Sequence, residues 1–278
     1  MRKTISFAFI LFSLSLTFGQ YCDHENVNYR SYLSKYDNNI LKPEDVRVLD
    51  LSNQNLDDIP SNINSYPNLK VLILSGNNIK HLSNALSNLP QLEVLDLTNN
   101  EIENFSTSLS YLKNLKELYI GNNRITHFST SLSYLHNLTI LDVSNNQISS
   151  LSKSMSYLKN LKELYIGNNK ITCFSNSLSY LNNLMILDVS NNQISSLSNS
   201  LSYLENLRIL DISNNKIEEL SNSLSYMKNL NVLILDGNPI NSINALRYNE
   251  KIKTVSIKNT TIAHRPNWLS YHVKLINY

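Results

Sequence analysis

The sequence predicts an α/β solenoid, in which a parallel β-sheet lines the concave face of a curved, right-handed arc and short helices or turns cover the convex face. A pattern of 23 residues begins at Val46 and recurs at constant spacing through the unit that begins at Leu230, giving nine full units. In each unit, apolar positions four and six alternate with positions three and five, the period-two signature of a short strand. Because no unit can bury its apolar side alone, neighbouring units must stack.

Residues 1–19 are predicted to be a signal peptide. Arg2 and Lys3 precede the uncharged apolar run from Ile5 to Phe18, and Gly19 marks the expected cleavage point. An uncleaved membrane anchor is the alternative, although the run is short for a membrane span. We therefore expect a secreted, cell-surface or periplasmic protein, with no membrane span in the mature chain.

The two cysteines, Cys22 and Cys173, are too few for a disulfide-stabilised scaffold, so apolar burial must stabilise the fold. Cys22 lies close to the expected cleavage point, which leaves lipid attachment open. The bulky Tyr21 beside it is a poor match to a lipoprotein processing site.

Three further segments follow the signal peptide. Residues 20–45 are predicted to form an N-terminal cap, with a short helix before Pro43. Residues 46–251 hold the nine units. Residues 252–278 hold a degenerate tenth unit and a C-terminal cap, in which Trp268 and Leu275 are expected to cover the end of the stack. Caps are needed because an open solenoid exposes its core and its edge strands.

Position nine is asparagine in eight of the nine full units. An amide offers both donors and an acceptor, so it can satisfy backbone groups where each strand ends. We expect the stacked amides to form a structural ladder rather than a ligand site. Its members are Asn77, Asn100, Asn123, Asn146, Asn169, Asn192, Asn215 and Asn238.

The unit resembles the leucine-rich repeat family. Leu138, Leu141, Val143, Asn146 and Ile148 match its L-x-x-L-x-L-x-x-N-x-I pattern, and the resemblance extends from Val46 to Ile262. The unit length is similar to that of many secreted bacterial repeats, and the absence of cysteine-rich caps favours a bacterial or protist type. Serine stands at Ser106, Ser129 and Ser152, where the family usually has proline.

The resemblance implies that a ligand binds the exposed strand positions of the concave face. Positions three and five there form an acidic and aromatic row beside an apolar one. Exposed aromatic side chains among charges suit a protein-binding patch. The alternative is that aspartate is only a soluble strand residue. The predicted partner-binding residues are Asp96, Glu117, Tyr119, Asp142, Glu163, Tyr165, Asp188 and Asp211.

Asp188 and Asp211 should face each other on adjacent strands, where like charges are destabilising. Either Arg208 screens the pair, or one carboxyl has a raised pKa, or a cation binds. The pair alone supplies too few oxygens for calcium, so we predict no metal site.

Composition and motifs exclude several functions. Without residues 1–19, basic and acidic side chains balance at 22 each, and no block of like charge appears, which argues against nucleic-acid binding. The chain has no phosphate-binding loop, no H-E-x-x-H and no G-x-S-x-G, so we predict neither catalytic residues nor a cofactor.

The expected function is therefore that of a non-enzymatic, monomeric protein-interaction module with an unidentified protein ligand. The rival is a structural or self-associating protein of the cell surface. Its assembly would use a strand edge or the tyrosines at position 20. Two other interpretations of these tyrosines are packing between units and stacking on carbohydrate. The tyrosines are Tyr111, Tyr134, Tyr157, Tyr180, Tyr203 and Tyr226.

Overall fold

The computed structural model describes residues 42–262 and 264–276. The signal peptide, Cys22 and most of the N-terminal cap, including its expected helix, lie outside these residues. The cap residues that are described include the 3₁₀ turn η1 (Pro43–Asp45), which directly precedes the first strand.

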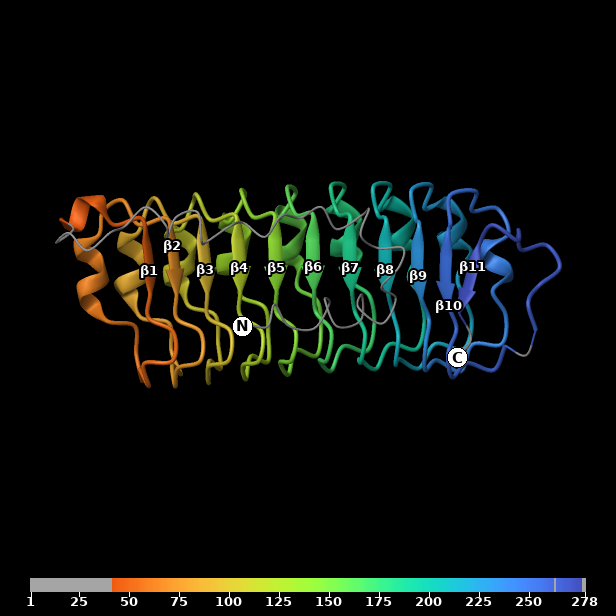
Figure 1. Cartoon of the computed structure of the whole chain (residues 1–278), viewed down its shortest axis with the longest axis horizontal. Coiled ribbons are helices and arrows are strands. Elements are labelled where there is room, and N and C mark those ends of the chain that lie inside the picture. The colour runs from red at the N-terminus through yellow and green to blue at the C-terminus, as the bar shows by residue number, and fades with distance from the viewer. Residues whose placement is uncertain (1–41, 263, 277–278) are drawn as a thin grey trace. The chain divides into compact units, whose positions relative to one another are not determined.

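Eleven short parallel strands form one open sheet in chain order, as the row of arrows in Figure 1 shows. Each strand covers positions three to five of its unit and pairs in register with the same positions of the next unit; Leu141, for example, is level with Leu118 and Leu164. The strands are β1 (Val48–Asp50), β2 (Val71–Ile73), β3 (Val94–Asp96), β4 (Glu117–Tyr119), β5 (Ile140–Asp142), β6 (Glu163–Tyr165), β7 (Ile186–Asp188), β8 (Ile209–Asp211), β9 (Val232–Ile234), β10 (Thr254–Ser256) and β11 (Lys274–Ile276).

The second half of each unit forms a 3₁₀ turn behind the sheet, which confirms the predicted short helices or turns (Figure 1). From η4 to η9, the serine before the turn accepts a hydrogen bond from the backbone N–H two residues later; Ser129, for example, accepts from Ser131 N at 3.1 Å. These turns are η2 (Ser61–Ser65), η3 (Asn84–Asn88), η4 (Thr107–Tyr111), η5 (Thr130–Tyr134), η6 (Lys153–Tyr157), η7 (Asn176–Tyr180), η8 (Asn199–Tyr203), η9 (Asn222–Tyr226) and η10 (Asn244–Leu246).

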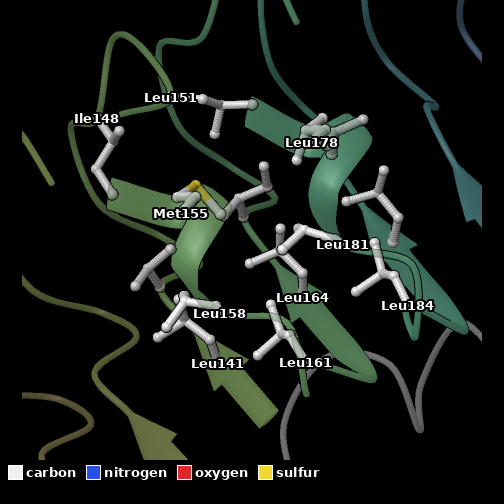
Figure 2. Packing of buried hydrophobic residues seen from close by; sticks show 14 of the residues in the cluster. Leu141, Ile148, Leu151, Met155, Leu158, Leu161, Leu164, Leu178, Leu181 and Leu184 are labelled. Atoms are coloured by element: carbon white, nitrogen blue, oxygen red, sulfur yellow. The ribbon is translucent and has the colours of Figure 1, made fainter. Parts of the chain in front are cut away.

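The core is a continuous column of leucine and isoleucine between the sheet and the turns. Figure 2 shows Leu141 and Leu164 from the strands packing beside Leu158 and Leu181 from the turns. Met155 occupies the place of leucine in its unit and is fully buried, because its volume is close to that of leucine. Every unit buries its apolar side against its neighbours, as stacked repeats require.

The asparagine ladder has the structural role that the sequence predicts. Asn146 Nδ2 donates to the carbonyls of Ile120 at 3.0 Å and Val143 at 3.1 Å. Its Oδ1 accepts from Ile125 N at 2.9 Å. Each amide thus ties the end of its own strand to the preceding unit.

A second column, at position eight, makes the tight turn beside the ladder. Seven asparagines of the nine full units there have φ between 50° and 57°, a left-handed conformation that asparagine tolerates better than most residues. Glycine replaces asparagine at Gly76, where φ is +72° and an added Cβ would lie 2.2 Å from Asn53 Oδ1.

The C-terminal cap contributes an eleventh strand, where the sequence pattern predicts ten. Strand β11 pairs with β10, placing Leu275 opposite Val255. Trp268 packs against the core and donates from Nε1 to Asn244 Oδ1 at 2.8 Å. The two residues cover the last unit as expected, but the cap also extends the sheet by one strand.

Candidate functional site: the outer face of the sheet

The sheet face, defined here as the outward side chains at positions three and five of β1 to β10, carries all eight predicted site residues. Register places those of position five in one row, in the order Asp96, Tyr119, Asp142, Tyr165, Asp188 and Asp211. Glu117 and Glu163 lie in the neighbouring row at position three, separated by Ile140. The structure therefore brings the predicted residues together on adjacent strands.

Their exposure differs from the expectation. Asp96, Tyr119, Asp142 and Tyr165 are partly exposed. Glu117, Glu163, Asp188 and Asp211 are buried, with exposed fractions of 8%, 7%, 5% and 0%. Strands about 4.8 Å apart bring side chains of successive units into contact, and so a strand-face position is not automatically a solvent-exposed one.

Each tyrosine of the row bonds to the glutamate two residues before it. Tyr119 donates from its hydroxyl to Glu117 Oε2 at 2.9 Å, and Tyr165 donates to Glu163 Oε2 at 2.7 Å. Burial and the Glu163 carboxylate raise the pKa of Tyr165 above its usual range, so its hydroxyl keeps the proton that it donates. The buried glutamates thus orient the partly exposed rings.

The aspartates of the row have a local structural role that the sequence analysis missed. Asp142 Oδ1 accepts from Ser144 N at 2.8 Å and from Ser144 Oγ at 2.6 Å. The carboxylates of Asp96, Asp188 and Asp211 accept from the N–H of the residue two positions later in the same way. This bond fastens the backbone where the strand ends.

A sequence signal for this role exists. Wherever position five is aspartate, position seven is serine or threonine; wherever position five is tyrosine, position seven is glycine (Gly121 and Gly167). The glycine gives room to the next unit: a Cβ added at Gly167 would lie 2.9 Å from Asp188 Oδ2. The pairing of Asp with Ser and of Tyr with Gly therefore reflects packing between adjacent units.

Asp188 and Asp211 do face each other, as the pattern predicts. Burial, with the Asp211 charge as the next cause, raises the pKa of Asp188 to about 7. Burial also raises the pKa of Asp211 to about 6. Asp211 Oδ2 is buried without a hydrogen-bond partner.

The burial of the two facing carboxyls supports a raised pKa as one explanation for this pair. Arg208 is exposed and forms no ion pair with any residue in the described ranges. Within the same ranges, no group of three or more His, Cys, Asp or Glu side chains could hold a metal ion.

The position-20 tyrosines lie on a different surface, at the ends of η4 to η9. They are between 50% and 65% exposed. Packing between units therefore buries only part of each tyrosine side chain. The described residues also include no helix long and apolar enough to cross a membrane.

Comparison with known proteins gives a consistent result. A family profile described as "Leucine-rich repeat region" matches residues 36–173 and 108–277. The structure of a leucine-rich repeat protein from Leptospira interrogans aligns with a TM-score of 0.78 and 31% identity, over 81% of this chain and 58% of that protein. A comparison with curated proteins found no significant match.

Two further solved structures align well. A plant peptide hormone receptor, RGFR1 in complex with RGF2, has a TM-score of 0.64 and 28% identity over 73% of this chain and 34% of the receptor. The functional domain of InlJ from Listeria monocytogenes has a TM-score of 0.68 and 24% identity, over 80% of this chain and 46% of that domain, which establishes likeness of fold. This chain thus spans little more than half the length of the Leptospira protein and less of the other two.

Proposed function

This chain belongs to the leucine-rich repeat family, and from that premise we propose that it is an exported, non-enzymatic module that binds a protein ligand on its sheet face. The observation that carries the proposal is the row of partly exposed side chains on β3 to β6, where Tyr119 and Tyr165 alternate with Asp96 and Asp142. Aromatic rings held in place among charges are the side chains that most often dominate protein interfaces.

The burial pattern refines the proposed contacts. Tyr119, Asp142 and Tyr165 would touch the ligand, since part of each side chain is exposed. Glu117 and Glu163 would act by holding the two hydroxyls. Asp188 and Asp211 would contribute through the charge state of the face rather than through direct contact, because they are buried.

Two observations support a protein as the ligand. Leucine-rich repeat proteins are generally non-enzymatic binding scaffolds, and the plant receptor that aligns here was solved with its peptide hormone. The position-five row also continues over several strands with constant spacing, which suits an extended contact.

The test substitutes Tyr119→Ala and Tyr165→Ala together and measures recovery of partners after crosslinking in the producing organism. Loss of the partners recovered by the wild-type chain, with an unchanged melting temperature, is the expected result. If a folded variant recovered the same partners, the sheet face would not be the binding surface. Thr107→Ala with Thr130→Ala, at exposed positions on η4 and η5 away from the sheet face, is the matched control.

Export is part of the proposal and is tested separately. The N-terminal sequence of the protein recovered from the medium or the cell envelope should begin close to Gln20. A chain that retains Met1 and stays in the cytoplasm would contradict export, and it would leave the binding test unaffected.

A second candidate function is self-association through the exposed position-20 tyrosines. Light scattering over a range of concentrations distinguishes the two functions. A constant monomer mass favours the binding module, whereas a mass that grows with concentration and falls back in Tyr157→Ser with Tyr180→Ser favours assembly.

A further inference from the structure

A shallow groove runs along the edge of the sheet where strands β4 to β7 begin. Its volume is about 330 Å³, and it is lined by Lys116, Asn137, Thr139, Asn160, Lys162 and Asn183. We call it the lysine groove. It lies at positions 23 and two of the units, apart from the position-five row of the sheet face.

The amides that line the groove are fixed by hydrogen bonds. Asn137, Asn160 and Asn183 each donate from Nδ2 to a carbonyl of the preceding unit, at 2.8 Å in every case. Thr139 donates from its hydroxyl to the carbonyl of Lys116 at 3.0 Å. These bonds hold the floor of the groove at a constant repeat.

Positive charge gathers along this edge in two clusters. The segments 111–116 and 157–162 both read YLKNLK, so that Lys113 and Lys116 in one correspond to Lys159 and Lys162 in the other. The segment between them, 134–139, reads YLHNLT and has no acidic residue. Two strand spacings separate the clusters by about 10 Å.

Part of this charge is neutralised by neighbours. Lys116 pairs with Glu93 in the preceding unit at 2.7 Å, and Glu93 is shared with Lys70. Lys162 is level with Thr139 in its preceding unit, and it forms no ion pair with the residues that the structure describes. The groove therefore presents ammonium groups that an anionic ligand would neutralise.

One lysine of the first cluster contacts an aromatic ring. The Lys113 Nζ lies 4.4 Å from the centroid of the Tyr134 ring, a cation–π contact. Tyr134 is 50% exposed. The groove itself combines positive charge, fixed amides and a hydroxyl.

We propose that the lysine groove binds an acidic polysaccharide that carries a carboxylate on alternate sugar residues. The two lysine clusters would each meet one carboxylate, and the neutral unit between them would meet the uncharged sugar. The asparagine and threonine side chains would bond to sugar hydroxyls.

The spacing of charge favours this ligand over a nucleic acid. A phosphodiester chain carries a charge at every residue, and proteins that hold it without sequence preference use a continuous basic groove. Here the matching positions of the middle unit are His136 and Thr139, so the basic surface is interrupted. The two basic clusters are separated by one neutral unit, as two carboxylated sugars of the proposed ligand are separated by one neutral sugar.

The test uses the full chain and hyaluronan oligosaccharides, in which a carboxylated sugar alternates with a neutral one. Binding is measured by titration calorimetry at about 50 mM and about 200 mM salt, and the affinity should fall several-fold at the higher salt because exposed charges are screened. Neutral dextran should not bind. Dextran binding as tight as that of hyaluronan would overturn the role of charge.

Matched variants locate the site. Lys116→Gln with Lys162→Gln should weaken hyaluronan binding by about tenfold or more, since each tenfold step needs only about 1.4 kcal/mol. Lys170→Gln with Lys216→Gln removes the same charge from position ten and should leave binding within about twofold of wild type. Equal losses of affinity in both variants would show that binding depends only on net charge, and they would contradict binding in the lysine groove.

Two further outcomes would also overturn the proposal: hyaluronan fails to bind at low salt, or single-stranded oligothymidylate binds at least as tightly as hyaluronan. The proposal is independent of the protein ligand proposed above. The Tyr119→Ala, Tyr165→Ala variant should bind hyaluronan as the wild-type chain does.

Discussion

At the scale of single residues, the position-nine asparagines connect neighbouring units through buried hydrogen bonds. Asn146 makes three buried hydrogen bonds, two to carbonyls and one from an N–H. Asn146→Ala removes all three bonds and leaves the buried Ile125 N–H without its acceptor, so it should lower the free energy of unfolding by about 2–4 kcal/mol. Urea denaturation measures the change.

Asn137→Ala is the control for that substitution. It removes one exposed bond, to the carbonyl of Lys113, and water can replace this bond. We expect a loss below about 1 kcal/mol. Similar losses of stability at both positions would show that the buried bonds of Asn146 stabilise the fold no more than the exposed bond of Asn137.

The paired aspartates make stability depend on pH. Because burial raises the folded-state pKa of Asp211 to about 6, the folded chain binds more protons than the unfolded chain between about pH 4 and that value. Asp188, with a pKa of about 7, extends the window upward. The stabilising protonation is complete below the unfolded pKa and is lost as the pH rises through the folded values.

Asp211→Asn removes one of these titrations. The variant should match the wild-type chain at about pH 4 and be more stable by about 1–3 kcal/mol at about pH 8, where the wild-type carboxylates are both charged. Thermal melts at the two pH values measure this difference. A variant that is less stable than wild type at pH 8 would contradict the raised pKa.

At the scale of elements, the serine before each of the turns η4 to η9 explains a departure from the family pattern. Pro60 stands before η2, as the family usually has it, whereas Ser106, Ser129 and Ser152 stand before η4 to η6. Proline begins such a turn by fixing φ, and serine begins it by accepting an N–H bond. The two residues serve the same position by different means.

The substitution Ser129→Ala tests that role. It removes the acceptor of two bonds, from Ser131 N at 3.1 Å and from Ser131 Oγ at 3.0 Å. The expected loss is about 1 kcal/mol, as for other capping residues. Thr130→Ala, one residue later and on the exposed side of the turn, should change the free energy of unfolding by less than about 0.5 kcal/mol. The urea midpoints of the two variants should therefore differ. Equal midpoints would show that Ser129 does not stabilise the turn as a cap.

The elements also mark how far the sequence predicts the structure. Strand positions, the ladder and the facing of Asp188 by Asp211 follow from the constant period, because every unit repeats the same register. Exposure on the sheet face does not follow, since it depends on the size of side chains in the adjacent units. Strand β11 does not follow either, because the C-terminal residues lack the unit pattern.

At the scale of the whole molecule, the stack is a set of interchangeable units. Residues 115–160 and 161–206 differ at eight of 46 positions, so they are two successive copies of a two-unit block. Both copies follow the same dipeptide boundary, since Asn114 precedes Leu115 and Asn160 precedes Leu161. Every unit contacts mainly its two neighbours, which makes the stability a sum over units and interfaces.

Deletion of residues 115–160 should therefore give a folded, shorter stack. The deletion joins Asn114 to Leu161, and the new neighbour of Glu93 is Lys162, which can replace Lys116 in the pair at that edge. Circular dichroism should retain the wild-type shape. The denaturant m-value should fall by roughly a fifth, in proportion to the surface lost, because m follows the area exposed on unfolding.

The control deletes residues 115–158, two fewer, which lengthens the connection from η4 to β6 by two residues and shifts all later units by two residues relative to the units before the junction. That shift places Lys159 and Asn160 where the buried position one and the exposed position two would be, and it misaligns the asparagine ladder at the junction. We expect this variant to unfold at much lower urea or to aggregate. If the two deletions had equal midpoints, stability would not depend on unit register, and the fold would not be the sum of identical steps that its sequence describes.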